Sequence, residues 1–293
     1  MIKQIDKAYY LAGESSSLLI WINEIGKPVT LYFGPHIEEP KDLKPFLPII
    51  PCAQGSSTIY DEKKAPTLSL DSLDLDLSTP YKGDYGDPSL LIEGMGSPIY
   101  DFVFERAEIR QPHDLTGLPS PHGGEDELIL FLRDSKQNVE AELHYLTYRK
   151  SDVIGRYLKI NNEGSNIVIR KAASLQLILN GTDFEMVSFY GGWAGEFQKE
   201  VTPLTHVRSS FDSSTGSSSA RHNPFFIIKK KNTDFENGLC YGFNLVYSGN
   251  HLEEAELSSF GKLRIQNGIS PLGFAKHLKK GESFITPLAI MPK

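Results

Sequence analysis

The sequence VEAELHYLTYRKSDVIGRYLKIN, residues 139–161, contains the pattern that decides the fold. Val, Ile, Leu and Tyr recur in two short runs, residues 139–149 and 153–161, with a few polar residues between them. Short runs rich in β-branched and aromatic residues, bounded by polar or turn-forming residues, are typical of β-strands. We therefore expect two strands here, joined by a short connection.

The same pattern extends in both directions from this pair, and helical periods are scarce. A hairpin turning at Gly26 is predicted from the runs at 18–23 and 29–33. Further strands are predicted at 67–77, 89–93, 101–109, 127–133, 167–179, 225–230, 241–248, 254–259, 262–267 and 283–291. Many strands at this spacing indicate an all-β fold with few helices, a large sandwich of two antiparallel sheets. We expect residues 1–293 to form a single domain.

Two segments interrupt the strands. Residues 38–55 hold four prolines, and residues 209–220, SSFDSSTGSSSA, are rich in serine. Proline cannot donate to a strand ladder, so the first segment is predicted to be a long loop. The second is predicted to be a mobile surface loop, which could also order around a sugar or a partner subunit.

The composition is that of a soluble globular protein, with 40% hydrophobic and 23% charged residues. A net charge of −7 argues against nucleic-acid binding. The only basic run, Lys229–Lys231, is predicted to be a solvated strand end. The N-terminal residues lack the apolar segment of a secretory signal, and no stretch is apolar enough for a membrane span. We expect a soluble, cytoplasmic protein.

The chemical motifs are few. Cys52 and Cys240 form no CxxC pair; one long-range disulfide stays open, with two reduced thiols as the simpler alternative. No nucleophile elbow, phosphate loop or HExxH motif occurs. The stretch from His122 to Glu127 resembles a metal site, but exposed acidic turns are more common, so no metal or cofactor is predicted. Aspartates alternate with leucines over 67–77 and predict a polar strand face; they are Asp71, Asp74 and Asp76.

A series of landmarks in order resembles the non-catalytic N-terminal β-domain of family 36 α-galactosidases. The resemblance spans roughly residues 29–287. The matching stretches are VTLYFG (29–34), GDY with PS (83–89), YLTY with DVI and Arg156 (145–156), NNEG (161–164), GGW with Glu196 (191–196), SSS with HNPF (217–225), YGF with LVYSGN (241–250), GISP with Phe274 (268–274) and GESF through TP (281–287).

The resemblance implies a β-supersandwich whose family carries its active site in a following (β/α)₈ barrel, which these residues do not contain. It also implies homo-oligomers in which N-terminal loops help to close a neighbouring subunit's site, and α-galactoside substrates such as melibiose and raffinose. Three family side chains are replaced: the arginines by Gly86 and Gly195, and a tryptophan by Lys276.

Five residues are candidates for sugar binding or subunit contact: Asp84, Tyr85, Trp193, His222 and Asn223. Trp193 lies in a glycine-rich, exposed turn, where its ring could stack on a sugar or pack at an interface. Asp84 and Tyr85 could instead form an Asx-type turn, and the last two could fix the Ser-rich loop through structural hydrogen bonds.

Three functions remain open. The first is the N-terminal, non-catalytic domain of a retaining α-galactosidase, with both catalytic carboxylates outside these residues. The second is a stand-alone carbohydrate-binding module or inactive remnant. The third follows from fold analogy with sugar mutarotases, with His222 or His144 acting together with Glu196.

Overall fold

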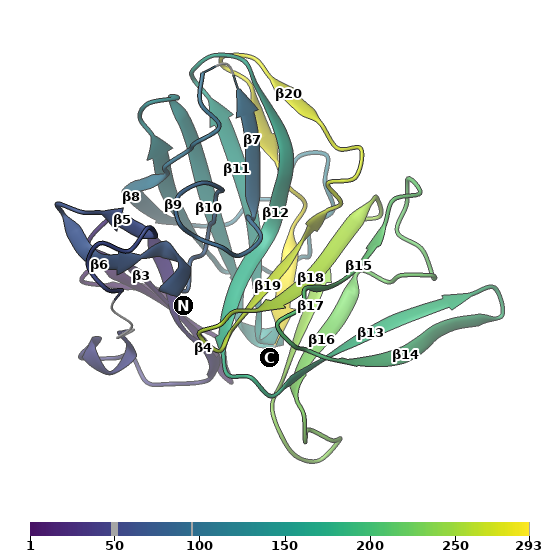
Figure 1. Cartoon of the computed structure of the whole chain (residues 1–293). Helices are drawn as coiled ribbons and strands as arrows, with labels where there is room; N and C mark the ends of the chain where they lie inside the picture. The colour runs from purple at the N-terminus through teal and green to yellow at the C-terminus, as the bar shows by residue number, and fades with distance from the viewer. Residues whose placement is uncertain (48–51, 95, 293) are drawn as a thin grey trace.

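The computed structural model describes residues 1–47, 52–94 and 96–292. Its strands form four antiparallel sheets, and the helices of the described part are three short 3₁₀ turns. These are η1 (Lys44–Phe46), η2 (Leu70–Ser72) and η3 (Arg149–Ser151). The prediction of an all-β fold is confirmed (Figure 1).

The largest sheet has ten strands. Its order is β14 (Gly195–Pro203), β13 (Phe184–Gly192), β16 (Phe225–Lys230), β17 (Cys240–Leu245), β22 (Ala289–Pro292), β11 (Val153–Asn162), β10 (Val139–Tyr148), β9 (Asp126–Asp134) and β8 (Val103–Arg110), with β21 (Ser283–Ile285) also on β11. The short strand β22 lies between β17 and β11, so it joins the two halves of the sheet.

The second sheet has six strands and packs against the first. It contains β15 (Ser209–Ser213), β18 (His251–Leu257), β19 (Lys262–Ile269), β12 (Ile167–Asn180) and β20 (Lys276–Leu278), with β7 (Leu90–Gly94) also paired to β12. A bulge between Ala173 and Leu175 interrupts the register of β12 with β19. Such a bulge increases the local bend and twist of a strand.

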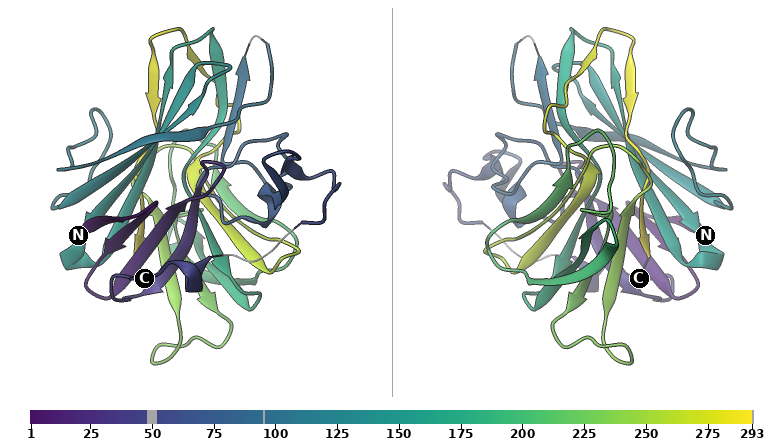
Figure 2. Two further views of the ribbon diagram at one scale, coloured as in Figure 1. Left: turned by 90° about the vertical axis from the view of Figure 1, so that its left-hand side faces the viewer. Right: turned by 90° about the vertical axis from the view of Figure 1, so that its right-hand side faces the viewer.

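An N-terminal sheet of four strands lies beside this sandwich (Figures 1 and 2). Its strands are β1 (Ile2–Ile5), β2 (Ala8–Ala12), β3 (Ser16–Ile22) and β4 (Pro28–Pro35), and a small hairpin of β5 (Ile59–Asp61) and β6 (Ala65–Ser69) follows. The sequence predicted β3 and β4 but missed β1 and β2. One face of this sheet, including Leu11, Leu18 and Ile20, joins the main core.

The main core lies between the two large sheets. On β10, Ala141, Leu143 and Tyr145 point inward at every second position, and Leu175 and Leu177 of β12 belong to the same buried cluster. Each leucine side chain among them contributes about 1.5–3 kcal/mol when it is fully removed from water. The alternating pattern of residues 139–149 therefore correctly predicts which side chains of β10 face the core.

Two predictions need correction, one of a strand and one of a loop. Residues 67–77 form a strand only to Ser69; the chain then makes η2 and continues irregularly, with Asp74 and Asp76 buried instead of on a solvated face. Residues 209–220 are not wholly a loop, because β15 pairs with the edge of β18 and Phe211 packs against the core. The serine-rich composition predicted a loop. Burial of the Phe211 ring and pairing with the edge of β18 favour a strand over residues 209–213 instead.

Other predictions hold in part. The run at 283–291 is split into β21 and β22 around Pro287, which has no N–H to donate. Strand β16 ends at Lys230, within the predicted basic run, but Lys229 is not free in solvent, because its Nζ lies 2.6 Å from Glu185 Oε2. In the proline-rich segment, residues 38–47 contain only η1 and no strand, while residues 48–51 lie outside the described part.

A clip joins the N-terminal sheet to the sandwich. Asp152, in the left-handed region at φ +53°, accepts hydrogen bonds from the backbone N–H and hydroxyl groups of Ser15 and Ser16. A Cβ at Gly13 would lie 2.0 Å from Asp152 Oδ1, so any larger residue there would displace the carboxylate from these hydrogen bonds.

Replacing Asp152 with alanine is expected to lower the free energy of unfolding by about 1–3 kcal/mol, because four donors lose a charged acceptor. Urea unfolding measures the loss, and hydrogen exchange of β2 and β3 locates it. Asp183→Ala, at an exposed position, is the matched control. Equal unfolding midpoints for the two variants would show that the clip contributes nothing.

Candidate functional site

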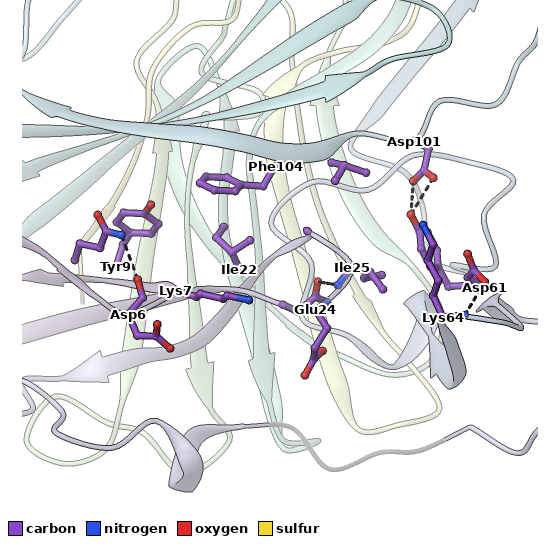
Figure 3. Close-up of a pocket in the computed structure, with 15 residues that line it drawn as sticks. Asp6, Lys7, Tyr9, Ile22, Glu24, Ile25, Asp61, Lys64, Asp101 and Phe104 are labelled. Atoms are coloured by element: carbon purple, nitrogen blue, oxygen red, sulfur yellow. Dashed lines mark hydrogen bonds between the residues drawn. The ribbon is translucent and has the colours of Figure 1, made fainter.

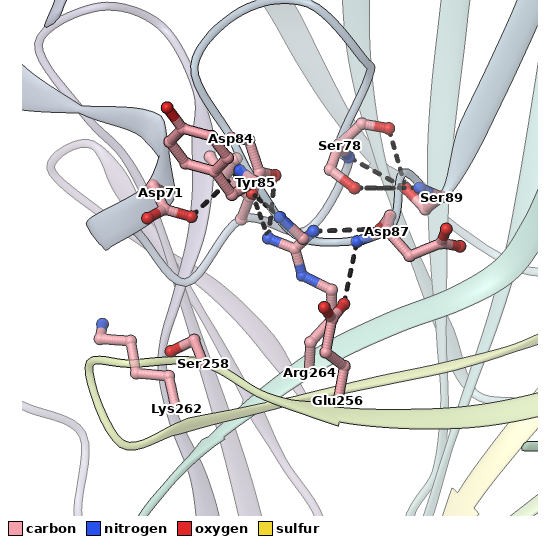
Figure 4. Close-up of polar contacts among 12 residues, drawn as sticks. Asp71, Ser78, Asp84, Tyr85, Asp87, Ser89, Glu256, Ser258, Lys262 and Arg264 are labelled. Carbon is pink, nitrogen blue, oxygen red and sulfur yellow. Dashed lines mark hydrogen bonds and ion pairs between the residues drawn. The ribbon is translucent and has the colours of Figure 1, made fainter. Parts of the chain in front are cut away.

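The turn that carries Asp84 is fastened to strand β19. Arg264 Nη2 lies 2.7 Å from Asp84 Oδ1 and 2.8 Å from Oδ2, and the backbone N–H of Gly86 donates to Oδ1 at 3.1 Å (Figure 4). The Asp84 side chain is only 2% exposed. Burial raises the pKa of Asp84, although the Arg264 guanidinium opposes that rise. Asp84 therefore forms the expected Asx-type turn, and both of its carboxylate oxygens are used in hydrogen bonds that hold this turn.

Tyr85, next in the chain, has the opposite environment. Its backbone N–H donates to Asp71 Oδ1 at 3.0 Å, and its side chain is 74% exposed. The backbone is therefore fixed while the ring faces solvent. Of the two residues predicted in this turn, Tyr85 is the one available to a ligand or a partner.

The same turn is held at its other end by charged side chains from three strands and by Arg208, which lies just before β15. Asp87 pairs with Lys171 and with Arg208 Nη1, and its backbone N–H donates to Glu256 Oε2 at 2.9 Å. Arg264 Nη1 also donates to the Asp87 carbonyl oxygen at 3.0 Å. These contacts join residues 84–87 to β12, β18 and β19, so the turn is rigidly placed. These contacts could not be predicted from the sequence, because the partners are 80–180 residues away.

A projecting arm carries Trp193. Strands β13 and β14 extend from the edge of the ten-stranded sheet and connect through residues 193–194, with Ala194 at φ +61° (Figure 1). The Trp193 side chain is 96% exposed, which confirms the predicted exposed turn. Phe197 is 58% exposed and stacks on Phe189 with ring centroids 4.4 Å apart. The sequence predicted the turn but missed both strands of the arm.

His222 and Asn223 lie at the base of this arm. His222 forms a bridge with Tyr190 of β13, and its carbonyl oxygen accepts from His251 Nε2 at 3.0 Å. The N–H of Asn223 donates to the Phe189 carbonyl at 3.1 Å. Their described contacts are thus structural and fix the loop that follows β15. The five candidates fall into two groups: the arm with its base, and the Asp84–Tyr85 turn on β19.

A buried charged network occupies the outer face of β9, β10 and β11. His144 Nδ1 lies 2.7 Å from Glu127 Oε1, and Nε2 lies 3.0 Å from Glu142 Oε2. These three side chains are at most 8% exposed. His144 therefore pairs with two nearby carboxylates and not with Glu196, so that part of the mutarotase hypothesis is wrong.

A groove of about 650 Å³ lies between the N-terminal sheet and the β5–β6 hairpin (Figure 3). Ile22 and Phe104 form apolar parts of its lining, while Lys7, Glu24 and Lys64 add charges of both signs. None of the five candidates lines it. Asp101 at its end is already occupied by Lys27 and by the Tyr60 hydroxyl.

No group of three or more metal-ligating side chains is suitably placed for an ion in the described residues, the stretch from His122 included. Both Cys52 and Cys240 are free thiols. In the part of the chain that the structure covers, no helix has the length and apolar character needed to cross a bilayer.

Comparison with known proteins agrees with this architecture. A bifunctional α-galactosidase/sucrose kinase, AgaSK, from Mediterraneibacter gnavus is 37% identical over 77% of this chain and 25% of its own length. The α-galactosidase Mel36A from Lactobacillus acidophilus is 31% identical over 98% of this chain and 40% of its own. A structure of the Geobacillus stearothermophilus α-galactosidase AgaA in complex with raffinose superposes with a TM-score of 0.90, at 28% identity, over 98% of this chain and 40% of that one.

The chain thus spans 40% or less of the length of these relatives. The model of the glycosyl hydrolase family 36 N-terminal domain matches residues 26–279. That range contains the turn of residues 84–87, called the clamped turn below, together with the arm and its base. The chain belongs to the glycosyl hydrolase family 36 N-terminal domain family.

Proposed function

We propose that residues 1–293 form one non-catalytic domain of a retaining, cytoplasmic α-galactosidase that acts on α-galactosides such as melibiose and raffinose. In this proposal both catalytic carboxylates of the enzyme lie outside these residues. The two free cysteines fit a reducing compartment. In this proposal the domain supports assembly of the oligomer and forms part of the rim of a neighbouring subunit's active site.

The observation that carries the proposal is the arm. Trp193 is 96% exposed, and Phe197 and Tyr190 are also exposed on the same hairpin, so the described residues leave this apolar surface largely uncovered. Exposed apolar clusters of this kind mark interaction sites. Because the aromatic rings lie on a projecting hairpin, they can reach a second copy of the protein (Figure 1).

A chimera tests the enzymatic part. The chain would replace the matching N-terminal 40% of AgaA from Geobacillus stearothermophilus, and hydrolysis of raffinose would be measured. We expect a folded, active chimera and no hydrolysis by the chain alone. Hydrolysis by the isolated chain would overturn the non-catalytic assignment, and a folded but inactive chimera would overturn the supporting role.

Replacing Trp193 with alanine is expected to weaken self-association of the chain by about tenfold or more, because a buried interface aromatic often contributes 2 kcal/mol or more. Sedimentation velocity over a concentration series measures the change. Lys199→Ala, exposed on the same arm, is the matched control. Identical sedimentation of the two variants and the parent would exclude the arm as the subunit contact.

A further inference from the structure

A cavity of about 330 Å³ lies between the clamped turn and the β18–β19 hairpin. Its lining includes Asp71, Tyr85, His206, Glu256, Lys262 and Arg264. Figure 4 shows Asp71 and Tyr85 on one side and Ser258 and Lys262 on the other. The volume is sufficient for one sugar ring, and the exposed Tyr85 ring stands at its edge.

The charges around this cavity leave an excess of carboxylate over cation. Two carboxylates and two cations line it, and Arg264 pairs with Asp84 while Lys262 pairs with Asp74. One oxygen of Glu256 accepts from Asp87 N–H, and one oxygen of Asp71 accepts from Tyr85 N–H. Backbone hydrogen bonds hold these two carboxylates in place without neutralising them, so an anionic ligand would be repelled, whereas the hydroxyl groups of a neutral ligand find fixed acceptors.

Several hydrogen-bonding atoms remain available at the cavity. Among the described residues, Glu256 Oε1 and Asp71 Oδ2 have no hydrogen-bond partner, and both can accept from hydroxyl groups. His206 Nδ1 donates to the Leu257 carbonyl at 3.1 Å, which leaves Nε2 as an acceptor. Acceptors beside an aromatic face match a polyol, whose hydroxyl groups donate and whose C–H surface stacks on a ring.

Gly86 determines the shape of the wall. A Cβ at this position would lie 2.2 Å from Arg264 Nη1 and 2.4 Å from Cζ. The guanidinium therefore occupies the space that any side chain at position 86 would need. The arginine that the family turn carries after Asp-Tyr is absent here, and Arg264 brings a guanidinium to the same turn from β19.

We propose that this cavity binds one neutral sugar ring, with Tyr85 as the stacking platform, Glu256, Asp71 and His206 as acceptors, and Arg264 as the residue that positions the turn. The geometry specifies a neutral polyol; the choice of an α-galactoside as the preferred ligand rests on the proposed function. The site lies within one chain, so it does not require the arm or a second subunit.

Titration of the ¹⁵N-labelled chain with melibiose, followed by amide chemical shifts, tests the proposal. We expect shifts confined to residues 71, 84–87, 206 and 256–264, with a millimolar Kd. Tyr85→Ala is expected to weaken binding about 3–10-fold, the range for losing one aromatic contact. Gly86→Ala is expected to weaken it as well, because the new methyl group displaces the Arg264 guanidinium.

Tyr81→Ala is the matched control, since Tyr81 is 65% exposed in the same loop but does not line the cavity. Equal effects of Tyr81→Ala and Tyr85→Ala, no shifts with melibiose, or shifts centred on Trp193 would each overturn the site. Equal affinity for maltose would keep the polyol site and overturn its assignment to galactosides. Hydrolysis by the chimera is measured separately, so failure of this site and failure of the proposed function are distinguishable.

Discussion

Replacing Asp76 with alanine is expected to lower the free energy of unfolding by about 3–5 kcal/mol, because it removes a buried carboxylate whose charge interacts with the Arg156 guanidinium. Asp76 is 1% exposed, and its carboxylate accepts from the hydroxyl groups of Thr30 and Tyr145. Arg156, 3% exposed, donates through Nη2 to the Asp76 carbonyl oxygen and through Nη1 to that of Gln176. Alanine would leave the Arg156 charge uncompensated and two hydroxyl groups without their acceptor.

Urea unfolding at neutral pH measures this loss. Asp114→Ala, at an exposed position, controls for removing a carboxylate as such. Asp76→Asn keeps the shape and an acceptor oxygen but removes the charge. Its loss of unfolding free energy is therefore expected to lie between those of Asp76→Ala and Asp114→Ala. A loss below about 1 kcal/mol for Asp76→Ala is the size typical of a surface ion pair. It would contradict the stabilising role assigned to the buried Asp76 carboxylate.

Replacing Glu127 with glutamine is expected to lower stability at neutral pH by about 2–3 kcal/mol and to make the remaining stability less sensitive to acid. Burial alone would raise the pKa of Glu127, but hydrogen bonds from His144, Arg110 and Tyr157 outweigh it and lower the pKa to about 2. Because this value lies below the ordinary 4.5, the ionised carboxylate stabilises the folded state above pH 4.5. That contribution disappears as the pH falls from about 4.5 toward 2.

Unfolding free energies measured from pH 7 down to pH 2.5 check this prediction. The difference between the parent chain and Glu127→Gln is expected to shrink across the acidic range. Glu163→Gln, at an exposed position, is expected to leave the profile unchanged. A difference that stays constant with pH would mean that the loss comes from packing and not from the charge.

The sequence predicted strands well where a regular pattern has one consistent meaning. Over residues 139–149, alternate side chains enter one core, so the period is visible without the partner sheet. Over 67–77 a similar alternation was misleading, because Asp74 and Asp76 are also buried. Their partners, Lys262 and Tyr145, are remote in sequence, and no local pattern announces them.

The candidate site divides in the same way. The exposure of Trp193 follows from its glycine-rich surroundings and could be predicted. The burial of Asp84 and the freedom of Tyr85 depend on Arg264, which is 180 residues away from the aspartate. Adjacent residues of one turn thus have different environments for a reason that only tertiary structure reveals.

The position of β22 has a consequence for biosynthesis. Residues 289–292 provide the seam between β17 and β11, so those two strands have unpaired edges until this segment has left the ribosome. Pairing over such long sequence separations is slow, and exposed strand edges invite intermolecular association. Ribosome-bound nascent chains ending before Ala289 are therefore expected to be an aggregation-prone stage of synthesis, and pairing of β22 completes the ten-stranded sheet.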